Sequence, residues 1–436
     1  MFDAITDALR KRTDLLGWTL REVTRRGSQL YAVPGAVESV RDVTEERYVI
    51  DVLRDTTAPG GQPSAGAGNV TLLPGADIDA AMAAAIDAAS LHAGLVRNPP
   101  YGLPGPASLP DVPLLDEVLC RDMAGELAAA HQRLVDAVRG ETGVRMTAAE
   151  FFAEEASVRL RNSRGIDVHQ TGTSLEVEWV LLARKAGHEV ETFVGMRRRR
   201  LADLNLQEVV AERAGWARDL LAAQAPPRHA GPVILAGSAL AEFMDTGVIQ
   251  NLGSAAARFS KSSTWEVGEP VFREPVRGDP LTVWANRQAS YGVASDRFDA
   301  EGIPSQRLLL IDNNRLAAFS AGQRYAEYLR IPPTGEFGVI EVAAGRTAAA
   351  SLREGNHVEI AAFSAFEADD VTGDFASEIR LGYTVTGGRR IPFKGGQLIG
   401  NYLSALADAT WSRETDFHGI YLGPAAARFE SLTVAP

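Results

Sequence analysis

The sequence predicts an α+β fold: an N-terminal two-layer α/β domain, with an antiparallel sheet and helices, followed by a mainly-β C-terminal domain. Apolar residues recur at helical spacing in parts of the first half and with period two over residues 157–197. Strand-like runs fill most of the second half, without the regular alternation of strands and long helices that a doubly wound sheet needs. We expect domains at residues 1–227 and 228–436, divided at the breaker "APPRHAGP".

The first quarter of the chain opens with a helix pattern, followed by short strand-like pieces, "QLYAV", "VESVRDV" and "RYVIDVLRD". The stretch "TTAPGGQPSAGAG" is rich in Gly, Pro and Ala and predicts a flexible loop. A clear helix, "PGADIDAAMAAAIDAASLHAGL", comes next. Asp77 can cap it, and Ile78, Met82 and Ile86 form an apolar stripe at i, i+4 and i+8.

A Pro-rich connector, "RNPPYGLPGPASLPDVP", leads into a second long helix predicted over residues 114–140. The period then changes to two, which predicts antiparallel strands joined by turns at "NSRG" and "KAGH". Leu175, Val177, Trp179 and Leu181 share one face of these strands. A helix over residues 204–224 closes the first domain.

The second half begins with a short buried strand, "PVILAG", after which Ser238 is expected to cap a brief helix, "ALAEFMDTGVI". Strands are predicted at "PLTVWANR", "RLLLIDNNRLAAFS", "GVIEVAAG", "HVEIAAFSAFEAD", "SEIRLGYTVTGGRRIPFKGG" and "FESLTVAP".

Composition excludes several classes of protein. The chain has 436 residues, 45% hydrophobic and 23% charged, which is ordinary for a globular protein. Its longest apolar runs fall far short of the ~18 residues of a membrane span, and the N-terminus has no apolar core of a secretory signal. One cysteine, Cys120, allows no disulfide framework, so we expect a cytoplasmic location. The net charge of −12 argues against a nucleic-acid partner, and the basic run Arg197–Arg200 is interpreted as a solvated strand end.

The usual catalytic motifs are missing. The sequence contains neither a phosphate-binding GxxxxGK[ST] loop nor a GxSxG nucleophile turn. None of the seven histidines lies three to five residues from another, so no helix presents a His pair to a metal. "HEVETF", which starts at His188, has the His-Glu pair of a zinc protease motif but no second His. Cys120 lies within an amphipathic helix, where a packing role is expected.

Two acidic clusters remain. Asp296, Asp299 and Glu301 could hold a hard cation or serve acid/base chemistry, but Gly302 and Pro304 favour a turn whose backbone N–H groups Asp299 and Glu301 bind. The second cluster favours a polar loop between strands, in which a carboxylate caps backbone N–H groups. Its members are Glu367, Asp369, Asp370, Asp374 and Glu378.

Six segments stand out in order along the chain: "NSRG" at 162–165, "VILAGSALAEFM", "SKSSTWEVGEPV", "FDAEGIP" from Phe298, "VTGDFASEIRLGYTV" and "KGGQLIGNYLSAL". Together, and in this order, they resemble the TldD/PmbA family of peptidase subunits and modulators of DNA gyrase. "PYGLP" and the helix around "DIDAAMAAAIDAA" match more weakly, so the resemblance covers nearly the whole chain.

In the TldD-like branch of this family, the helix after the second domain's first strand carries HExxxH, and a later cysteine completes a zinc site. Here the corresponding helix has no histidine between Ala239 and Gln250, and the second half has no cysteine. Leu240, Phe243 and Met244 occupy it instead. The chain therefore resembles the metal-free PmbA/TldE-like branch, and the family's zinc ligands carry over to no residue here.

The resemblance implies a non-catalytic subunit of a TldD/TldE-type zinc metallopeptidase that degrades or matures unfolded peptides. It implies a heterodimer with an HExxxH-bearing TldD-like partner, which holds the zinc, and no cofactor on this chain. Asp374, Phe375 and Ser377 lie in the most motif-like segment and are expected to contact peptide substrate. Two alternatives stay open: a divergent homologue recruited to natural-product or peptide maturation with metal-independent chemistry, and a binding or scaffolding protein without peptidase activity.

Overall fold

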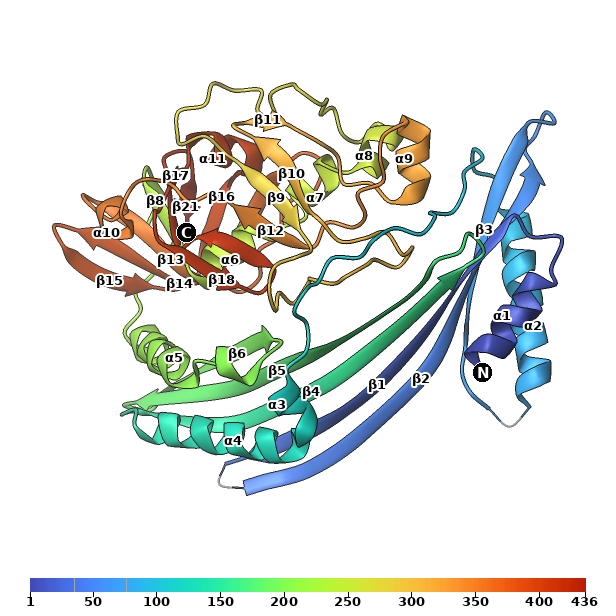
Figure 1. Ribbon diagram of the computed structural model, residues 1–436. Coiled ribbons are helices and arrows are strands. Elements are labelled where there is room, and N and C mark those ends of the chain that lie inside the picture. The colour runs from blue at the N-terminus through green and yellow to red at the C-terminus, as the bar shows by residue number, and fades with distance from the viewer. Residues whose placement is uncertain (35, 76) are drawn as a thin grey trace.

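A six-stranded antiparallel sheet forms the N-terminal half of the computed structural model, which describes residues 1–34, 36–75 and 77–436 (Figure 1). The strand order is β3-β2-β1-β4-β5-β6. The strands are β1 (Gly17–Val33), β2 (Ala36–Thr57), β3 (Pro63–Leu72), β4 (Val144–Asn162), β5 (Asp167–Lys185) and β6 (His188–Arg198). The expected pieces of β2 are therefore one continuous strand. The turns at "NSRG" and "KAGH" are confirmed, the latter with positive φ at Ala186 and Gly187.

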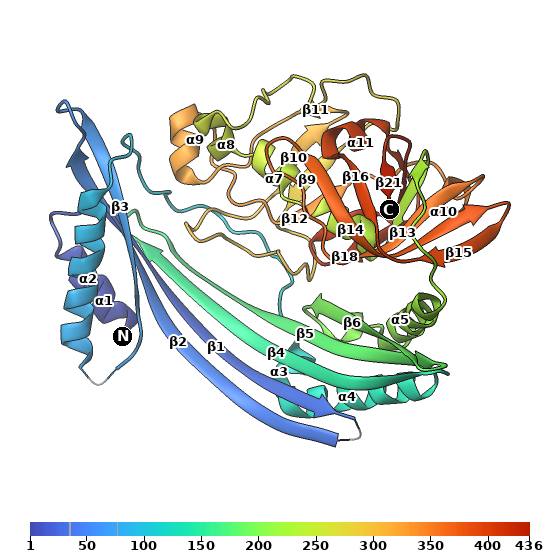
Figure 2. The same cartoon turned by 180° about the vertical axis from the view of Figure 1, so that it is seen from behind.

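Helices cover one face of this sheet at both of its ends (Figures 1 and 2). Helices α1 (Phe2–Arg10) and α2 (Ile78–Leu95) pack on β1 to β3. Helices α3 (Glu117–Arg121), α4 (Met123–Arg139) and α5 (Leu206–Leu221) lie toward the other end, and a short 3-10 turn, η1 (Leu201–Asp203), precedes α5. The predicted common face of β5 is confirmed, because Leu175, Val177, Trp179 and Leu181 are at most 1% exposed beneath α4 and α5.

Two helix predictions need correction or qualification. The helix expected over residues 114–140 is broken into α3 and α4, because Asp122 adopts a non-helical conformation and caps α4 by accepting from the Gly125 N–H. Asp77 does cap α2, accepting from the Ala80 N–H. Of the predicted stripe, Ile86 is buried and Met82 half-buried, whereas the Ile78 side chain lies outside the described part of the structure.

The prediction of a flexible loop at "TTAPGGQPSAGAG" is wrong for the second half of this stretch. Residues 63–72 form edge strand β3 instead. Gly66 and Gly68 permit this because the backbone of β3 touches α2. A Cβ at Gly66 would lie 1.8 Å from the Ala93 carbonyl oxygen, and one at Gly68 would lie 2.0 Å from that of Ala89. Small residues here serve close packing rather than flexibility.

The C-terminal half contains two sheets around a shared apolar core. One has the order β11-β10-β9-β12-β19-β18, and the other β17-β20-β8-β13-β14-β16-β21-β7, with β15 paired to β14. The first is built from β9 (Val283–Asn286), β10 (Arg307–Asp312), β11 (Arg315–Leu316), β12 (Val339–Val342), β18 (Thr415–His418) and β19 (Tyr421–Pro424). The second is built from β7 (His229–Ala230), β8 (Val233–Ala236), β13 (His357–Phe363), β14 (Asp374–Thr386), β15 (Arg389–Phe393), β16 (Gln397–Asn401), β17 (Thr410–Trp411), β20 (Ala426–Phe429) and β21 (Thr433–Ala435).

Short helices connect these strands, and the expected α+β fold is confirmed. They are α6 (Ser238–Met244), α7 (Val248–Leu252), α8 (Ala255–Ser260), α9 (Gln323–Leu329), α10 (Ala349–Leu352) and α11 (Tyr402–Asp408). Ser238 does not cap α6 as expected. Gly237 takes the N-cap position with φ 54° and ψ −127°, so the backbone turns sharply between β8 and α6 without a side-chain cap. No helix within the described ranges is both long and apolar enough to span a membrane.

The two halves meet where the concave side of the N-terminal sheet faces the C-terminal domain (Figure 1). Arg199, directly after β6, donates to the carbonyl oxygens of Gly292 and Ser295 at 2.7 Å each and to that of Thr173 at 3.0 Å. Burial lowers the pKa of its guanidinium, since its bonds go to backbone carbonyls. The basic run is therefore not simply a solvated strand end, because only Arg197 is exposed.

We predict that Gly68→Ala lowers the free energy of unfolding by about 1–3 kcal/mol, because its Cβ overlaps the α2 backbone. Urea denaturation measures this change. Gly215→Ala, on α5 with open space around it, is the matched control and should leave stability unchanged or raise it by up to about 1 kcal/mol. Equal effects of the two substitutions would contradict close packing of β3 on α2.

We predict that Arg199→Met lowers the free energy of unfolding by at least about 2 kcal/mol, because it removes the hydrogen bonds that the guanidinium donates to the carbonyl oxygens of Thr173, Gly292 and Ser295. Arg197→Met, two positions earlier, removes only an exposed ion pair with Glu176 and should cost less than about 1 kcal/mol. Thermal and urea unfolding of both variants tests the difference, and a cost for Arg197→Met equal to that of Arg199→Met would refute it.

Candidate functional site

Three of the motif-like segments converge where the two domains join, and their contacts are structural. The Asn162 side chain of "NSRG" donates to the Pro104 carbonyl oxygen at 2.8 Å and accepts from the N–H groups of Arg164 and Ile166. Ile166 in turn packs with Leu160 against Phe298 of "FDAEGIP". The connector, the strand turn and the C-terminal domain therefore meet at one point.

The first acidic cluster lies at this junction, and its predicted turn is confirmed. Asp299 is 5% exposed and accepts from the backbone N–H groups of Glu301 and Ile303, each at 2.9 Å. Burial raises the pKa of Asp299, and the nearby Arg287 guanidinium lowers it in part. Glu301 does not bind the turn itself, because it accepts from the Gln323 N–H at the start of α9. Both carboxylates therefore accept hydrogen bonds from backbone N–H groups and stabilise the local backbone conformation.

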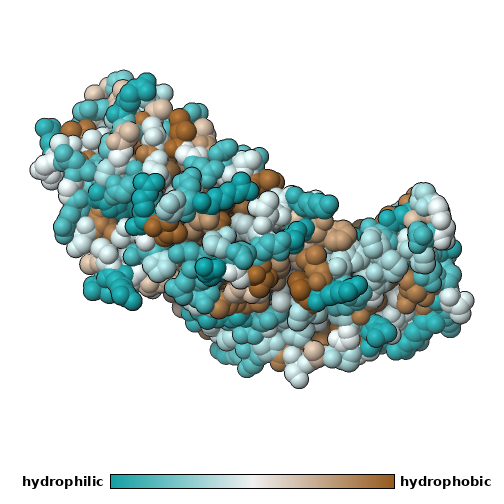
Figure 3. All heavy atoms as spheres, turned by 90° about the horizontal axis from the view of Figure 1, so that it is seen from above, coloured by the Kyte–Doolittle hydropathy of each residue, from teal (hydrophilic) through white to brown (hydrophobic). Residues whose placement is uncertain are grey.

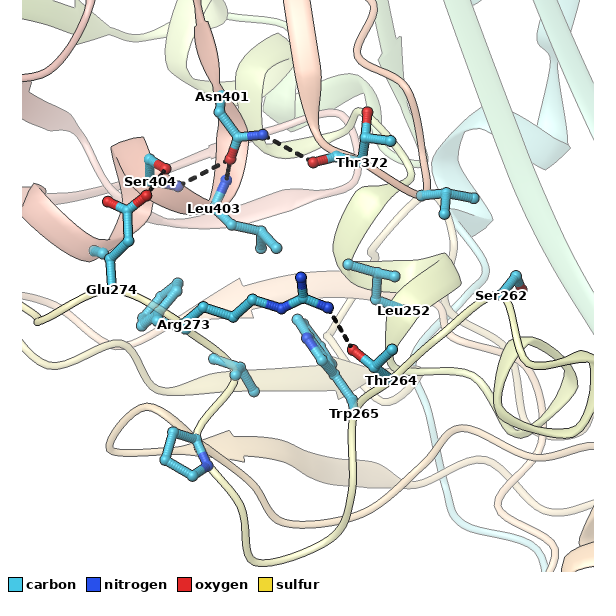
Figure 4. Close-up of a pocket in the computed structure, with 15 residues that line it drawn as sticks. Leu252, Ser262, Thr264, Trp265, Arg273, Glu274, Thr372, Asn401, Leu403 and Ser404 are labelled. Carbon is cyan, nitrogen blue, oxygen red and sulfur yellow. Dashed lines mark hydrogen bonds between the residues drawn. The ribbon is translucent and has the colours of Figure 1, made fainter.

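Three other motif-like segments surround a cavity of about 720 Å³ in the C-terminal domain (Figure 4). Ser262, Thr264 and Trp265 come from the segment after α8, Val371 and Thr372 from the loop before β14, and Asn401 and Ser404 from the start of α11. Segments more than a hundred residues apart in the sequence therefore line one hollow. Its volume lies within the ~300–1,000 Å³ typical of ligand sites.

Asn401 organises one wall of this cavity. Its side-chain oxygen accepts from the N–H groups of Leu403 and Ser404 and so caps α11. Its amide nitrogen donates to the Thr372 carbonyl oxygen at 2.8 Å and to Asp374 Oδ1 at 2.9 Å. One side chain thus joins β16, α11 and the loop before β14 by hydrogen bonds.

The opposite wall is both apolar and charged (Figure 4). The Trp265 side chain is almost buried, whereas Arg273 extends along the cavity and donates to Thr264 Oγ1 at 3.3 Å. Glu274 accepts a hydrogen bond from the Ser404 hydroxyl at 3.0 Å. An extended peptide could bury apolar side chains here and meet both charges at the rim.

Of the three substrate residues expected from the sequence, only Asp374 is exposed beside this cavity. Phe375 is 6% exposed and packs against Phe243 and Phe366, and Ser377 is 4% exposed with its hydroxyl near the Glu367 backbone. The alternation of β14 explains the difference, since successive side chains point to opposite faces and Phe375 and Ser377 face inward.

The predicted polar loop is confirmed for Glu367, Asp369 and Asp370, whereas Asp374 and Glu378 of this cluster lie in strand β14. Asp369 Oδ1 accepts from the N–H groups of Val371 and Thr372, which lowers the pKa of Asp369. Asp370, Asp374 and Glu378 are exposed.

Sequence reasoning missed several residues that line the cavity. Trp265 and Asn401 stand inside quoted motif segments, and an aromatic residue and an Asn next to Gly were signals that could have singled them out. Arg273 and Glu274 follow such a segment in irregular backbone, where no periodicity marks them.

Helix α6 follows β8 and has a fully buried inner face. Leu240, Phe243, Met244 and Val248, just beyond it, are all 0% exposed, and Phe243 stacks on Tyr402 at 4.7 Å between ring centroids. Among residues 1–34, 36–75 and 77–436, no three His, Cys, Asp or Glu side chains come together in a way that could hold a metal ion. The residues of α6 do not fit a zinc ion.

Known proteins are similar to parts of this chain. The family model for the PmbA/TldA metallopeptidase C-terminal domain matches residues 228–436. The uncharacterized protein MJ0231 of Methanocaldococcus jannaschii is 22% identical over 288 residues, which cover 62% of this chain and 65% of that relative's length.

Solved structures show the same fold over the whole chain. TldE from Thermococcus kodakarensis superimposes with a TM-score of 0.83 at 16% identity, covering 99% of this chain and 100% of that one. TM0727 of Thermotoga maritima, a proposed modulator of DNA gyrase, gives a TM-score of 0.81 at 17% identity, with both chains fully covered. At such low sequence identities, the structural similarity shows a shared fold and no more. Residues 228–436 belong to the family of PmbA/TldA metallopeptidase C-terminal domains.

Proposed function

We propose that this chain is the non-catalytic, TldE/PmbA-like subunit of a zinc metallopeptidase of the TldD/TldE type. In this proposal a TldD-like partner binds the zinc through HExxxH, the two chains form a heterodimer in the cytoplasm, and the complex cleaves unfolded peptides. The proposal rests on α6, which stands where the metal-bearing branch carries HExxxH and has core residues and no histidine instead.

Peptide binding is compatible with the architecture. Strands β3 and β6 form the two edges of the N-terminal sheet. An extended peptide can add to such an edge through main-chain hydrogen bonds. The cavity behind Asn401 supplies apolar surface beside charged groups. We propose that Asp374 faces peptide there, whereas Phe375 and Ser377 support β14 from inside the core.

We predict that the purified chain contains no stoichiometric zinc and cleaves unfolded peptides only when an HExxxH-bearing partner is added. Elemental analysis measures the zinc, and a fluorogenic peptide measures cleavage by each chain alone and by the mixture. One zinc per chain, or cleavage by this chain alone, would refute the proposed role.

We predict that Asp374→Ala raises the KM of the complex for peptide several-fold and leaves assembly with the partner unchanged. Asp370→Ala is the matched control, because Asp370 is an exposed acid in the loop just before β14, and among the described residues its side chain is not bonded to Asn401. Peptide kinetics and size-exclusion chromatography separate the two effects. Loss of assembly with unchanged KM would place Asp374 at the subunit interface instead.

A further inference from the structure

A cleft between the two domains, which we call the α6 cleft, lies on the outward side of α6. It has a volume of about 360 Å³ and is lined by the end of β6, the first turns of α5, the outward face of α6 and the β18–β19 turn. A second recess of about 500 Å³ shares Arg198, Glu212 and His418 with it. The face of the molecule seen in Figure 3 is a mosaic of hydrophilic and hydrophobic residues.

Two carboxylates face this cleft without partners. Glu242 and Asp245 lie one turn apart on α6, and neither side chain forms a hydrogen bond or an ion pair with any residue that the structure describes. Both residues are exposed on this face. Partial desolvation of their carboxylates by the walls of the cleft raises the pKa of Glu242 to about 7 and that of Asp245 to about 6. Arg213 is near enough to lower the pKa of Glu242 in part, yet it makes no ion pair with it within the described residues.

Positive charge lines the other side of the cleft. Arg198 donates to the carbonyl oxygens of Asp203 and Arg197 and has no carboxylate within 4.0 Å in the described part of the chain. Arg213 stacks on Trp216, donates to the Ser238 hydroxyl, and forms an ion pair through its Nε with Glu212 at 3.4 Å. His418 is already bound to Asp416 at 2.8 Å. Arg197 and Arg213 are already paired with Glu176 and Glu212 of the same cleft. Among the residues that the structure describes, the charged groups of the cleft that form no ion pair are Arg198, Glu242 and Asp245.

Apolar side chains complete the lining. Val194 and Met196 of β6, Val209 of α5, and Ala241 and Ile420 contribute to it. The volume lies at the small end of the ~300–1,000 Å³ of small-ligand sites, so it suits a short molecule rather than a folded partner. A ligand with an ammonium group, a carboxylate and a short aliphatic body matches this lining.

We propose that the α6 cleft binds a short zwitterionic peptide, whose ammonium group contacts Glu242 and Asp245 and whose carboxylate contacts Arg198. The choice of a peptide rests on the proposed function, because a peptidase complex releases short zwitterionic products. The match between unpartnered charges of both signs does not depend on that function.

The unpartnered carboxylate also predicts a pH dependence of stability. Because the pKa of Glu242 rises from 4.5 to about 7 on folding, its ionisation favours unfolding. This cost is absent below about pH 4.5 and complete above about pH 7. The charged groups that face Glu242 are Glu176, Arg197, Arg198, Glu212, Arg213, Asp245 and His418. Glu242→Gln should therefore raise the melting temperature at pH 8 but not at pH 4, and a lower melting temperature at pH 8 would contradict this.

Titration calorimetry on the full-length chain tests the site with three probes: trialanine, N-acetyl-trialanine and trialanine amide. We expect trialanine to bind and each blocked peptide to bind at least about tenfold more weakly. The double variant Glu242→Gln, Asp245→Asn should abolish the preference for a free amino terminus, and Arg198→Gln the preference for a free carboxylate. Glu378→Gln, an exposed acid on β14, is the control and should behave like the unaltered chain.

The same measurements can overturn the inference. No binding of trialanine at millimolar concentration, equal binding of the blocked peptides, or preferences that survive the substitutions would each refute it. If these results occur while the chain still supports peptide cleavage by its partner, the inference fails and the proposed function stands. If trialanine binds as expected but no partner restores cleavage, the proposed function fails and the cleft remains a peptide site.

Discussion

The arrangement of this molecule depends on one half-buried arginine that joins its halves through backbone carbonyls. Arg199 leaves the last strand of the N-terminal sheet and donates to Gly292 and Ser295 in the C-terminal domain. A guanidinium presents several donors in a fixed plane, so one side chain binds the Thr173 carbonyl oxygen of the N-terminal half and those of Gly292 and Ser295 at the same time. The α6 cleft and the recess beside it lie between elements that this contact holds in register.

The residues that identified the family are largely those that build the molecule rather than those that act in it. Asn162 and Asp299 each bind two backbone N–H groups of a turn, and both turns meet at the domain junction. An Asp or Asn at such a position replaces a backbone partner and cannot be exchanged for a larger or apolar residue without leaving buried N–H groups unpaired. Carboxylates gathered in a sequence are therefore weak grounds for a metal or acid/base site.

The sequence and the structure agree where a local pattern has one physical solution. The period of two in β4 to β6, the turns at "NSRG" and "KAGH", and the cap at Asp77 were predictable because strand alternation and turn chemistry act between neighbours in the chain. Edge strand β3 was not, because Gly66 and Gly68 have an ordinary loop composition until α2 packs on them. The break at Asp122 was missed because the apolar spacing continues across it.

For the candidate site, too, the sequence determined some features and only the tertiary structure decided the others. From the sequence alone came the α+β class, the resemblance to the TldD/PmbA family and the missing histidines of α6, because each depends on residue type and order. Only the tertiary structure decided that Asp374 is exposed while Phe375 and Ser377 are buried, that Asn401 and Trp265 line one cavity, and that Glu242, Asp245 and Arg198 face one cleft. These facts come from segments that are distant in the chain and close in space, and no short-range pattern records such contacts.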